Sequence, residues 1–232
     1  MRFIRDSVRQ LKIGEKLLWL FSVMGITLSF FIMRNTDYLT LIDSLIGISA
    51  LIFVAKGNVI GQVMTVIFGV FYGIISAQYH YWSEVITYLG MTAPIALGAV
   101  VTWLRHPYEK GEVKVREMKR RDWVILALLT IAVTILFYFV LRWLDTPNIV
   151  FSTISIATSF SASALVLLRS EYYGIFYGMN DVVLIVLWTL ASIENINYFP
   201  MVLCFVIFLI NDLYGFYNWQ KIKRRQNRVK TG

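Results

Sequence analysis

The segment 172-YYGIFYGMNDVVLIVLWTLAS-192 is long and apolar enough to cross a membrane, yet Asn180 and Asp181 interrupt it near its middle. The following segment, 199-FPMVLCFVIFLINDLYGFYNW-219, repeats the pattern with Asn211 and Asp212. An Asp at the centre of a membrane helix costs roughly 2.5–3.5 kcal/mol on insertion scales, so such groups usually face a protein-lined or water-filled interior. These two segments therefore predict a pathway for a small molecule.

The composition predicts a membrane protein of the all-α class. Of 232 residues 58% are hydrophobic, and the mean hydropathy is +0.65, which leaves too few polar residues to cover a soluble globule. Apolar stretches of about 18–25 residues, each long enough to cross the hydrocarbon core as a helix, recur between short polar breaks. We expect eight such helices, at about 16–33, 38–55, 58–77, 82–104, 123–143, 149–168, 171–192 and 198–219.

Basic residues predict the orientation. They gather before the first span, in the loop 105–121 and after the last span, and eight spans put these three regions on one side. The positive-inside rule makes that side cytoplasmic, with both termini inside. The net charge of +8 is thereby explained without a nucleic-acid partner, because the charges flank apolar spans. The first dozen residues set Phe3, Ile4, Val8 and Leu11 against Arg2, Arg5 and Arg9, which is typical of a short amphipathic helix on the membrane surface.

The two halves of the chain resemble each other. Residues 56–82 and 169–199 share spacing and hydropathy, and the halves end alike at Trp103-Leu104-Arg105 and Trp219-Gln220-Lys221. We therefore expect two three-helix repeats, 38–104 and 147–220, joined by a basic loop and one linking helix at 105–146. Because a single span links them, the repeats must be parallel, as in one established transporter plan. Residues 1–35 add an amphipathic N-terminus and an extra helix, and 221–232 form a basic cytoplasmic tail.

Helical spacing groups the candidate site residues on faces. Tyr173, Tyr177 and Asn180 share one face of their helix with Asp181 beside it, and Asn211 and Tyr214 share a face of the next. In the first repeat, Gln62 heads a polar stripe, and Tyr88 and Thr92 form a shorter one. We expect all nine to line one central cavity.

Each of these residues also has a structural interpretation. Amides in membrane helices often bridge neighbouring helices, and Tyr or Trp often marks the membrane interface. By position near span ends, Trp82, Trp103 and Trp219 are expected at that interface. Asp181 or Asp212 could instead carry protons in coupled transport. An integral-membrane enzyme is the alternative from a different class of function. Against it, His80 and His106 fall on opposite sides of the predicted membrane, and Cys204 has no His nearby in the sequence.

Several short motifs in a fixed order resemble the PnuC family of vitamin transporters, which is similar to the SWEET sugar transporters. They are Gly57-Asn58, GVFYG at 69–73, Tyr81-Trp82-Ser83-Glu84, YYGIFYGMND at 172–181 and NDLYGFYNW at 211–219. The family carries a Trp-x-x-Trp-x-x-Asn signature on the second helix of its second repeat. Here the comparable stretch has Tyr173, Phe176, Tyr177 and Asn180, without tryptophan.

The resemblance implies facilitated diffusion of nicotinamide riboside through a bacterial cytoplasmic membrane. Uptake would proceed by alternating access as a uniport, and a cytosolic kinase would trap the product without contacting the transporter. A deoxynucleoside or thiamine is the alternative substrate, and riboflavin is carried by another branch. Stacking of a planar ring on Tyr and hydrogen bonds from ribose to Asn or Asp suit such a ligand. No cofactor or metal is expected, and a homo-oligomer is left open.

Overall fold

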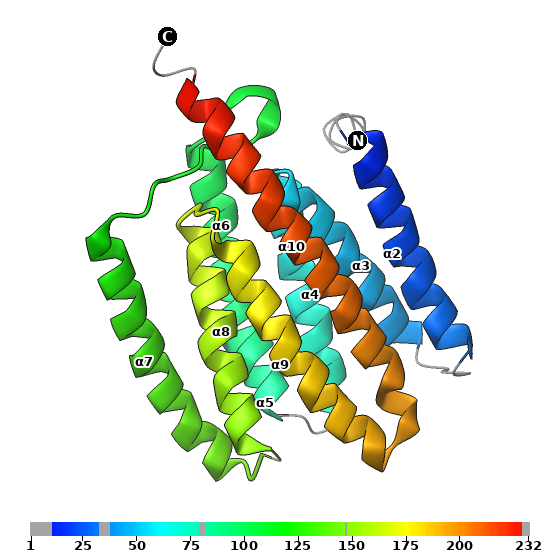
Figure 1. Cartoon of the computed structure of the whole chain (residues 1–232). Helices are drawn as coiled ribbons and strands as arrows, with labels where there is room; N and C mark the ends of the chain where they lie inside the picture. Colours follow the sequence, from blue (N-terminus) through cyan, green and yellow to red (C-terminus); the bar gives the residue numbers. More distant parts are fainter. Residues whose placement is uncertain (1–10, 33–37, 79–81, 147, 229–232) are drawn as a thin grey trace.

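The computed structural model describes residues 11–32, 38–78, 82–146 and 148–228, and in that part the fold is helical (Figure 1). Eight helical spans in these ranges are long and apolar enough to cross a membrane, which confirms the predicted number. The predicted amphipathic helix of the first dozen residues falls almost wholly outside the described residues. In chain order the helices are α2 (Ile13–Ile32), α3 (Tyr38–Ala55), α4 (Val59–Gln78), α5 (Trp82–Val85), η1 (Ile86–Thr92), α6 (Ala93–Arg105), η2 (Glu109–Gly111), α7 (Arg120–Trp143), α8 (Ile149–Leu167), α9 (Tyr173–Glu194), η3 (Ile196–Tyr198) and α10 (Phe199–Arg228).

The helices form two triplets that run in the same direction. In the first triplet α4 packs against both α3 and α6, and in the second α9 packs against both α8 and α10. Between the triplets, α3 packs against α10 and α6 packs against α8, so the first helix of each triplet meets the last helix of the other. Figure 1 shows α3, α6, α8 and α10 running upward and α4 and α9 downward. This reciprocal packing is that of parallel repeats related by an axis along the membrane normal.

The two remaining long helices lie at the edges. α7 connects the triplets and packs mainly on α8, and only 11% of its span is buried, against 50% for α3 and α8. The exposed apolar surface of α7 suits contact with lipid. α2 packs against both α3 and α10, so it touches both triplets (Figure 1).

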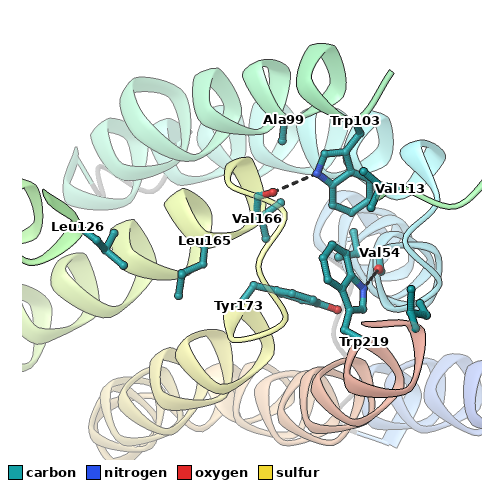
Figure 2. Close-up of a cluster of buried hydrophobic side chains, with 10 residues drawn as sticks. Val54, Ala99, Trp103, Val113, Leu126, Leu165, Val166, Tyr173 and Trp219 are labelled. Carbon is teal, nitrogen blue, oxygen red and sulfur yellow. Dashed lines mark hydrogen bonds between the residues drawn. The ribbon is translucent and has the colours of Figure 1, made fainter. Parts of the chain in front are cut away.

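A matched pair of tryptophans joins the triplets (Figure 2). Trp103 at the end of α6 donates from Nε1 to the carbonyl of Val166 at 3.0 Å, and Trp219 on α10 donates to the carbonyl of Val54 at 2.8 Å. The two indole centroids lie 5.5 Å apart, and the exposed fractions are 2% and 0%. The expectation that Trp103 and Trp219 mark the membrane interface is therefore wrong, because each fills the joint between the triplets.

Equivalent turns follow the first helix of each triplet. Gly57 N–H donates to Val54 O and Asn58 N–H to Phe53 O, which closes α3 with a left-handed residue at Gly57, φ +66°. Arg169 N–H donates to Val166 O and Ser170 N–H to Leu165 O, with Arg169 at φ +59°. Gly57 and Arg169 are thus structural equivalents, and the tryptophan of the other triplet donates to the same carbonyl in each turn.

The fourth span differs from the single regular helix predicted at 82–104. It begins as α5, widens into the π-helix η1 and continues as α6. Pro94 lies in the first turn of α6 and has no N–H to donate, while Ala93 N–H reaches back to Tyr88 O. The lost donor explains the local change of helix type, and π-turns are frequent at functional sites.

Residues 112–117, named the strap here, cross the end of the bundle where α10 terminates. Val113 N–H donates to Gly57 O at 2.8 Å, and Arg116 N–H donates to Arg169 O at 3.0 Å, so the strap contacts both equivalent turns. Gln226 on α10 bonds Val115 N–H and Val113 O, at 2.9 and 3.0 Å. The strap therefore ties both triplets together at one face.

Candidate functional site

A cavity of about 70 Å³ lies where the two triplets meet. Helices α3, α4 and the π-helix η1 supply one side, and α8, α9 and α10 supply the other. This volume holds several water molecules, but it is smaller than the roughly 300–1,000 Å³ of typical ligand pockets. The lining residues are Gly47, Ala50, Leu51, Val54, Gln62, Thr65, Phe68, Tyr88, Thr92, Ser159, Tyr173, Tyr177, Asn180, Asp181, Leu184, Phe205, Phe208 and Asp212.

Asn180 is held in place by the neighbouring helix α8. Its side-chain carbonyl accepts hydrogen bonds from Thr158 Oγ1 at 2.9 Å and from Ser155 Oγ at 3.2 Å. Both hydroxyls come from the Ser/Thr-rich run of α8. The bonds fix the carbonyl end of Asn180 on α8 and orient its amide group.

A pair of carboxyl groups forms the acidic part of the lining. Asp181 on α9 and Asp212 on α10 lie within hydrogen-bonding reach of each other, and both side chains are 3% exposed. Two carboxyl groups at this distance hold together when they share a proton, since two adjacent buried charges repel strongly. The pair therefore carries at most one negative charge.

Two buried polar atoms in the lining have no hydrogen-bond partner in the described structure. They are Asp181 Oδ2 and Thr92 Oγ1, one from each triplet. A buried polar atom without a partner costs about 1–3 kcal/mol, and such exceptions in native structures call for an explanation. A bound hydroxyl, amide or water would supply the missing hydrogen bonds. A polar ligand therefore gains most binding free energy by placing a polar group beside these two atoms.

Aromatic rings form the apolar part of the site. Tyr88 packs against Phe68 with centroids 5.8 Å apart and against Tyr72 at 4.3 Å. On the other triplet, Tyr173 and Tyr177 meet edge to face at 6.3 Å, and Tyr177 Oη lies 3.0 Å from Ser163 Oγ. Rings from both triplets thus flank the polar groups, and planar ligands are bound by such rings.

The structure brings together most of the predicted site residues. Those that line the cavity are Gln62, Tyr88, Thr92, Tyr173, Tyr177, Asn180 and Asp181. Eleven residues absent from the predicted set also line it, among them Phe68, Ser159, Phe205, Phe208 and Asp212. Asp212 follows Asn211 directly, as Asp181 follows Asn180, and this repeated Asn-Asp pair was the signal that could have identified it.

Asn211 and Tyr214 do not line the cavity, so their predicted position was wrong. Asn211 donates from Nδ2 to Ser22 Oγ of α2 at 3.0 Å, and Tyr214 Oη donates to Glu15 Oε1 at 2.7 Å. The face of α10 that they share is covered by the extra first helix. Spacing correctly placed both residues on one face, but it could not tell which neighbour covers that face.

Glu15 anchors α2 to both triplets. This buried carboxylate accepts the Tyr214 hydroxyl from α10 and pairs with Lys56 Nζ at 3.2 Å, beside the turn that follows α3. Lys12 N–H donates to its second oxygen at 2.6 Å. Since a buried carboxylate needs such partners, the network fixes the start of α2 across the joint between the triplets.

The charge of the cavity limits what it can bind. None of the described lining residues is Lys, Arg or His, whereas Asp181 and Asp212 are acidic. Across the described residues, no group of three or more His, Cys, Asp or Glu side chains is placed to hold a metal ion. The lining therefore suits a neutral or cationic planar molecule with hydroxyl groups, and it disfavours a phosphate.

Comparison with known proteins gives one consistent result. The sequence model of a family described as nicotinamide mononucleotide transporter matches residues 37–221. The nicotinamide riboside transporter PnuC of Neisseria mucosa is 23% identical over 90% of this chain and 82% of the relative. That of Haemophilus influenzae is 23% identical over 85% of each chain. A crystal structure of the vitamin B3 transporter PnuC superposes with a TM-score of 0.83 at 21% identity, covering 97% of this chain and 98% of that one.

Proposed function

The chain belongs to the nicotinamide mononucleotide transporter family, and on that premise we propose that it carries nicotinamide riboside across a bacterial cytoplasmic membrane. Transport is facilitated diffusion of one solute, a uniport. The two curated relatives above bear the name nicotinamide riboside transporter, which supports this substrate. An enzymatic activity has no comparable support.

The observation that carries the choice of substrate is the absence of basic side chains among the described cavity residues. The family description names the mononucleotide and the relatives' names the riboside, which differ by one phosphate group. A phosphate in this cavity would face Asp181 and Asp212 without Arg or Lys to neutralise it, at a cost of several kcal/mol. The riboside pyridinium ring, in contrast, gains from the acidic pair and from stacking on Tyr.

The two triplets support a mechanism of alternating access. The substrate binds between them, and rocking of one triplet against the other exposes the cavity to each side in turn. The present cavity of about 70 Å³ must widen to hold a nucleoside, so binding and rocking are coupled. The strap, which ties the triplets at one face, must then loosen whenever the cavity opens toward that face.

The orientation we propose places the strap, the end of α10 and both termini in the cytoplasm. The loop 105–121 and the end of α10 are rich in Lys and Arg and lie at the same face, which agrees with the positive-inside rule (Figure 1). We also propose that the repeats 38–104 and 147–220 carry out transport. The segments 1–35, 105–146 and 221–232 would anchor, link and orient these repeats.

Uptake by proteoliposomes tests the proposal. Purified protein is reconstituted, and entry of labelled nicotinamide riboside is compared with nicotinamide mononucleotide, thiamine, riboflavin and a deoxynucleoside. We expect rapid, saturable entry of the riboside alone. Preferred entry of thiamine or a deoxynucleoside would reassign the substrate, and equal entry of the mononucleotide would refute the argument from cavity charge.

Coupling is tested in the same vesicles. The riboside should equilibrate and stop at equal concentrations on both sides, with or without an imposed pH gradient. Accumulation above that level under a gradient would show proton coupling, and the shared-proton pair of Asp181 and Asp212 would then be its first candidate.

A further inference from the structure

A second hollow of about 300 Å³ lies at the strap face of the bundle, away from the central cavity. Its lining consists of His106, Lys114, Val115, Arg116, Glu117 and Arg169, none of which lines the central cavity. The first five come from the loop between α6 and α7 and the last from the turn between α8 and α9. The strap thus forms one wall and the second triplet the other.

Arg169 is buried although it carries a charge. Only 9% of the residue is exposed, and its Nε has no hydrogen-bond partner in the described structure. No ion pair to Arg169 occurs among the described residues, and burial together with neighbouring Arg116 lowers the pKa of its guanidinium from the ordinary value. A buried guanidinium is normally paired, so a negative group is missing beside it.

The backbone at Arg169 adds to this cost. The residue is left-handed at φ +59°, where the equivalent residue of the first triplet is Gly57. A side chain in that conformation costs roughly 1 kcal/mol or more relative to glycine. Glycine would close this turn at lower cost, which indicates that the guanidinium itself is needed at this place.

The other charges around the hollow leave a positive excess. Arg116 pairs with Asp122 at 2.6 Å, and Glu117 accepts a hydrogen bond from Asn227 Nδ2 at 3.0 Å. Lys114 is exposed at the rim, and His106 is oriented by a 2.9 Å contact between Nδ1 and Thr102 O. Three permanent cations, Lys114, Arg116 and Arg169, therefore line the hollow, and Glu117 is the one carboxylate among the lining residues. A second carboxylate, Asp122, pairs with Arg116 from outside the lining.

We propose that this hollow binds a phosphate group, held by Arg169 and Arg116 with Lys114 at the rim. A tetrahedral phosphate accepts several hydrogen bonds at once, and the planar fork of a guanidinium matches two of its oxygens. Free phosphate, a phosphate monoester and the headgroup of an anionic lipid all present this chemistry. Binding there joins the strap to the turn between α8 and α9, which Arg116 N–H already contacts through Arg169 O.

Thermal unfolding of the full-length protein in nanodiscs tests the proposal. One arm uses phosphatidylcholine discs and titrates inorganic phosphate against chloride at equal ionic strength. The other arm uses phosphate-free buffer and replaces part of the phosphatidylcholine with phosphatidylglycerol. The variants are Arg169→Gln and Lys114→Gln, and the matched control is Arg224→Gln, which removes an exposed charge from α10 outside the hollow.

We expect phosphate, phosphatidylglycerol or both to raise the melting temperature of the wild type and of Arg224→Gln equally. Arg169→Gln should weaken the apparent affinity at least about tenfold, as expected for loss of a charge-assisted bond, and Lys114→Gln about threefold. A response to phosphate identifies a free ligand, and a response to phosphatidylglycerol alone identifies a lipid headgroup. If Arg169→Gln does not fold, the Lys114→Gln comparison decides.

Two results would overturn the proposal. One is a wild type that responds to neither phosphate nor phosphatidylglycerol. The other is an undiminished rise in melting temperature with phosphate or phosphatidylglycerol in Lys114→Gln and in every Arg169 variant that folds. Riboside uptake plays no part in these measurements, so the test is independent of the substrate assigned above.

Discussion

At the scale of single residues, Asn180 and Asn211 show that equal sequence contexts lead to different roles. Each amide is followed by Asp and lies inside an apolar helix. Asn180 lines the central cavity, while Asn211 bonds Ser22 of α2. What separates them is the neighbouring helix, since α2 covers one face of α10 and no helix fills the cavity beside α9.

Replacing each asparagine by alanine should therefore give different results. We expect Asn180→Ala to raise the KM for riboside uptake about tenfold or more, because a ligand contact worth 1–2 kcal/mol is lost. Asn211→Ala should leave the KM unchanged and lower the melting temperature slightly, since a buried bond between membrane helices averages about 0.6 kcal/mol. Uptake kinetics and thermal unfolding separate the two effects. Equal KM in both variants would remove Asn180 from the site.

The charge of the acidic pair is tested by Asp181→Asn, which keeps the shape of the side chain. We expect weaker binding of the cationic riboside and little change for an uncharged nucleoside analogue, because only the former gains from the negative charge. Calorimetric titration with both ligands measures the ratio. An equal loss for both would show that Asp181 acts through hydrogen bonding alone.

Much of the cavity could be predicted at this scale from polar residues at helical spacing. Seven of the nine predicted residues line it, because a polar group inside a membrane span needs a partner or water. Phe205 and Phe208 carried no such signal, since apolar residues also face lipid. Asn211 and Tyr214 were misplaced because spacing identifies a face of a helix and not its neighbour.

At the scale of elements, close contacts between helices set the geometry of the acidic pair. Gly174 of α9 meets α10 so closely that an added Cβ would lie 2.8 Å from the backbone nitrogen of Phe216. The same Cβ would lie 2.5 Å from the carbonyl oxygen of Asp212, whose side chain meets that of Asp181 seven residues after Gly174. Gly14 in α2, in contrast, has no atom within 4 Å of such a Cβ.

Gly174→Ala should consequently destabilise the protein by about 1–3 kcal/mol, the usual cost of overpacking, and reduce riboside uptake. Gly14→Ala is the matched control and should change neither, since its added methyl group meets open space. Thermal unfolding and initial uptake rates measure both variants. A Gly174→Ala protein as stable and active as the control would contradict the close packing of α9 and α10.

The existence of each long helix followed from length and hydropathy, but two local details did not. The fourth span contains the π-helix η1, which length and hydropathy did not indicate. The sequence comparison of the two halves also set Gly57 beside Ser170, whereas the hydrogen bonds pair Gly57 with Arg169. A left-handed arginine is too unusual for spacing and hydropathy to suggest it.

At the scale of the whole molecule, two parallel triplets enclose the cavity. The odd number of linking spans already required this arrangement, and the swapped bonds of Trp103 and Trp219 display it in the structure. Two features of the whole molecule could not be predicted from the sequence: the position of the strap and the packing of α2 over α10. Each depends on contacts between residues more than 100 positions apart.

Because the two tryptophan bonds are equivalent, removing either should have the same effect. Trp103→Phe and Trp219→Phe keep an aromatic ring but lose the donor, so each should lower the free energy of unfolding by about 1 kcal/mol. Trp143→Phe is the control and should be neutral, since that side chain is 82% exposed at the end of α7. Unfolding by denaturant in detergent measures the three. Clearly unequal losses at Trp103 and Trp219 would contradict the two-fold relation of the triplets.

The most direct measurement is a structure of the protein with nicotinamide riboside bound. We predict density for the ligand between α4, η1, α8 and α9, with a ribose hydroxyl near Asp181 Oδ2 or Thr92 Oγ1 and the ring against Tyr88 or Tyr177. The cavity should be larger than in the present structure. Ligand density outside the space between the triplets, or an unchanged empty cavity at saturating ligand, would contradict the proposed transport site.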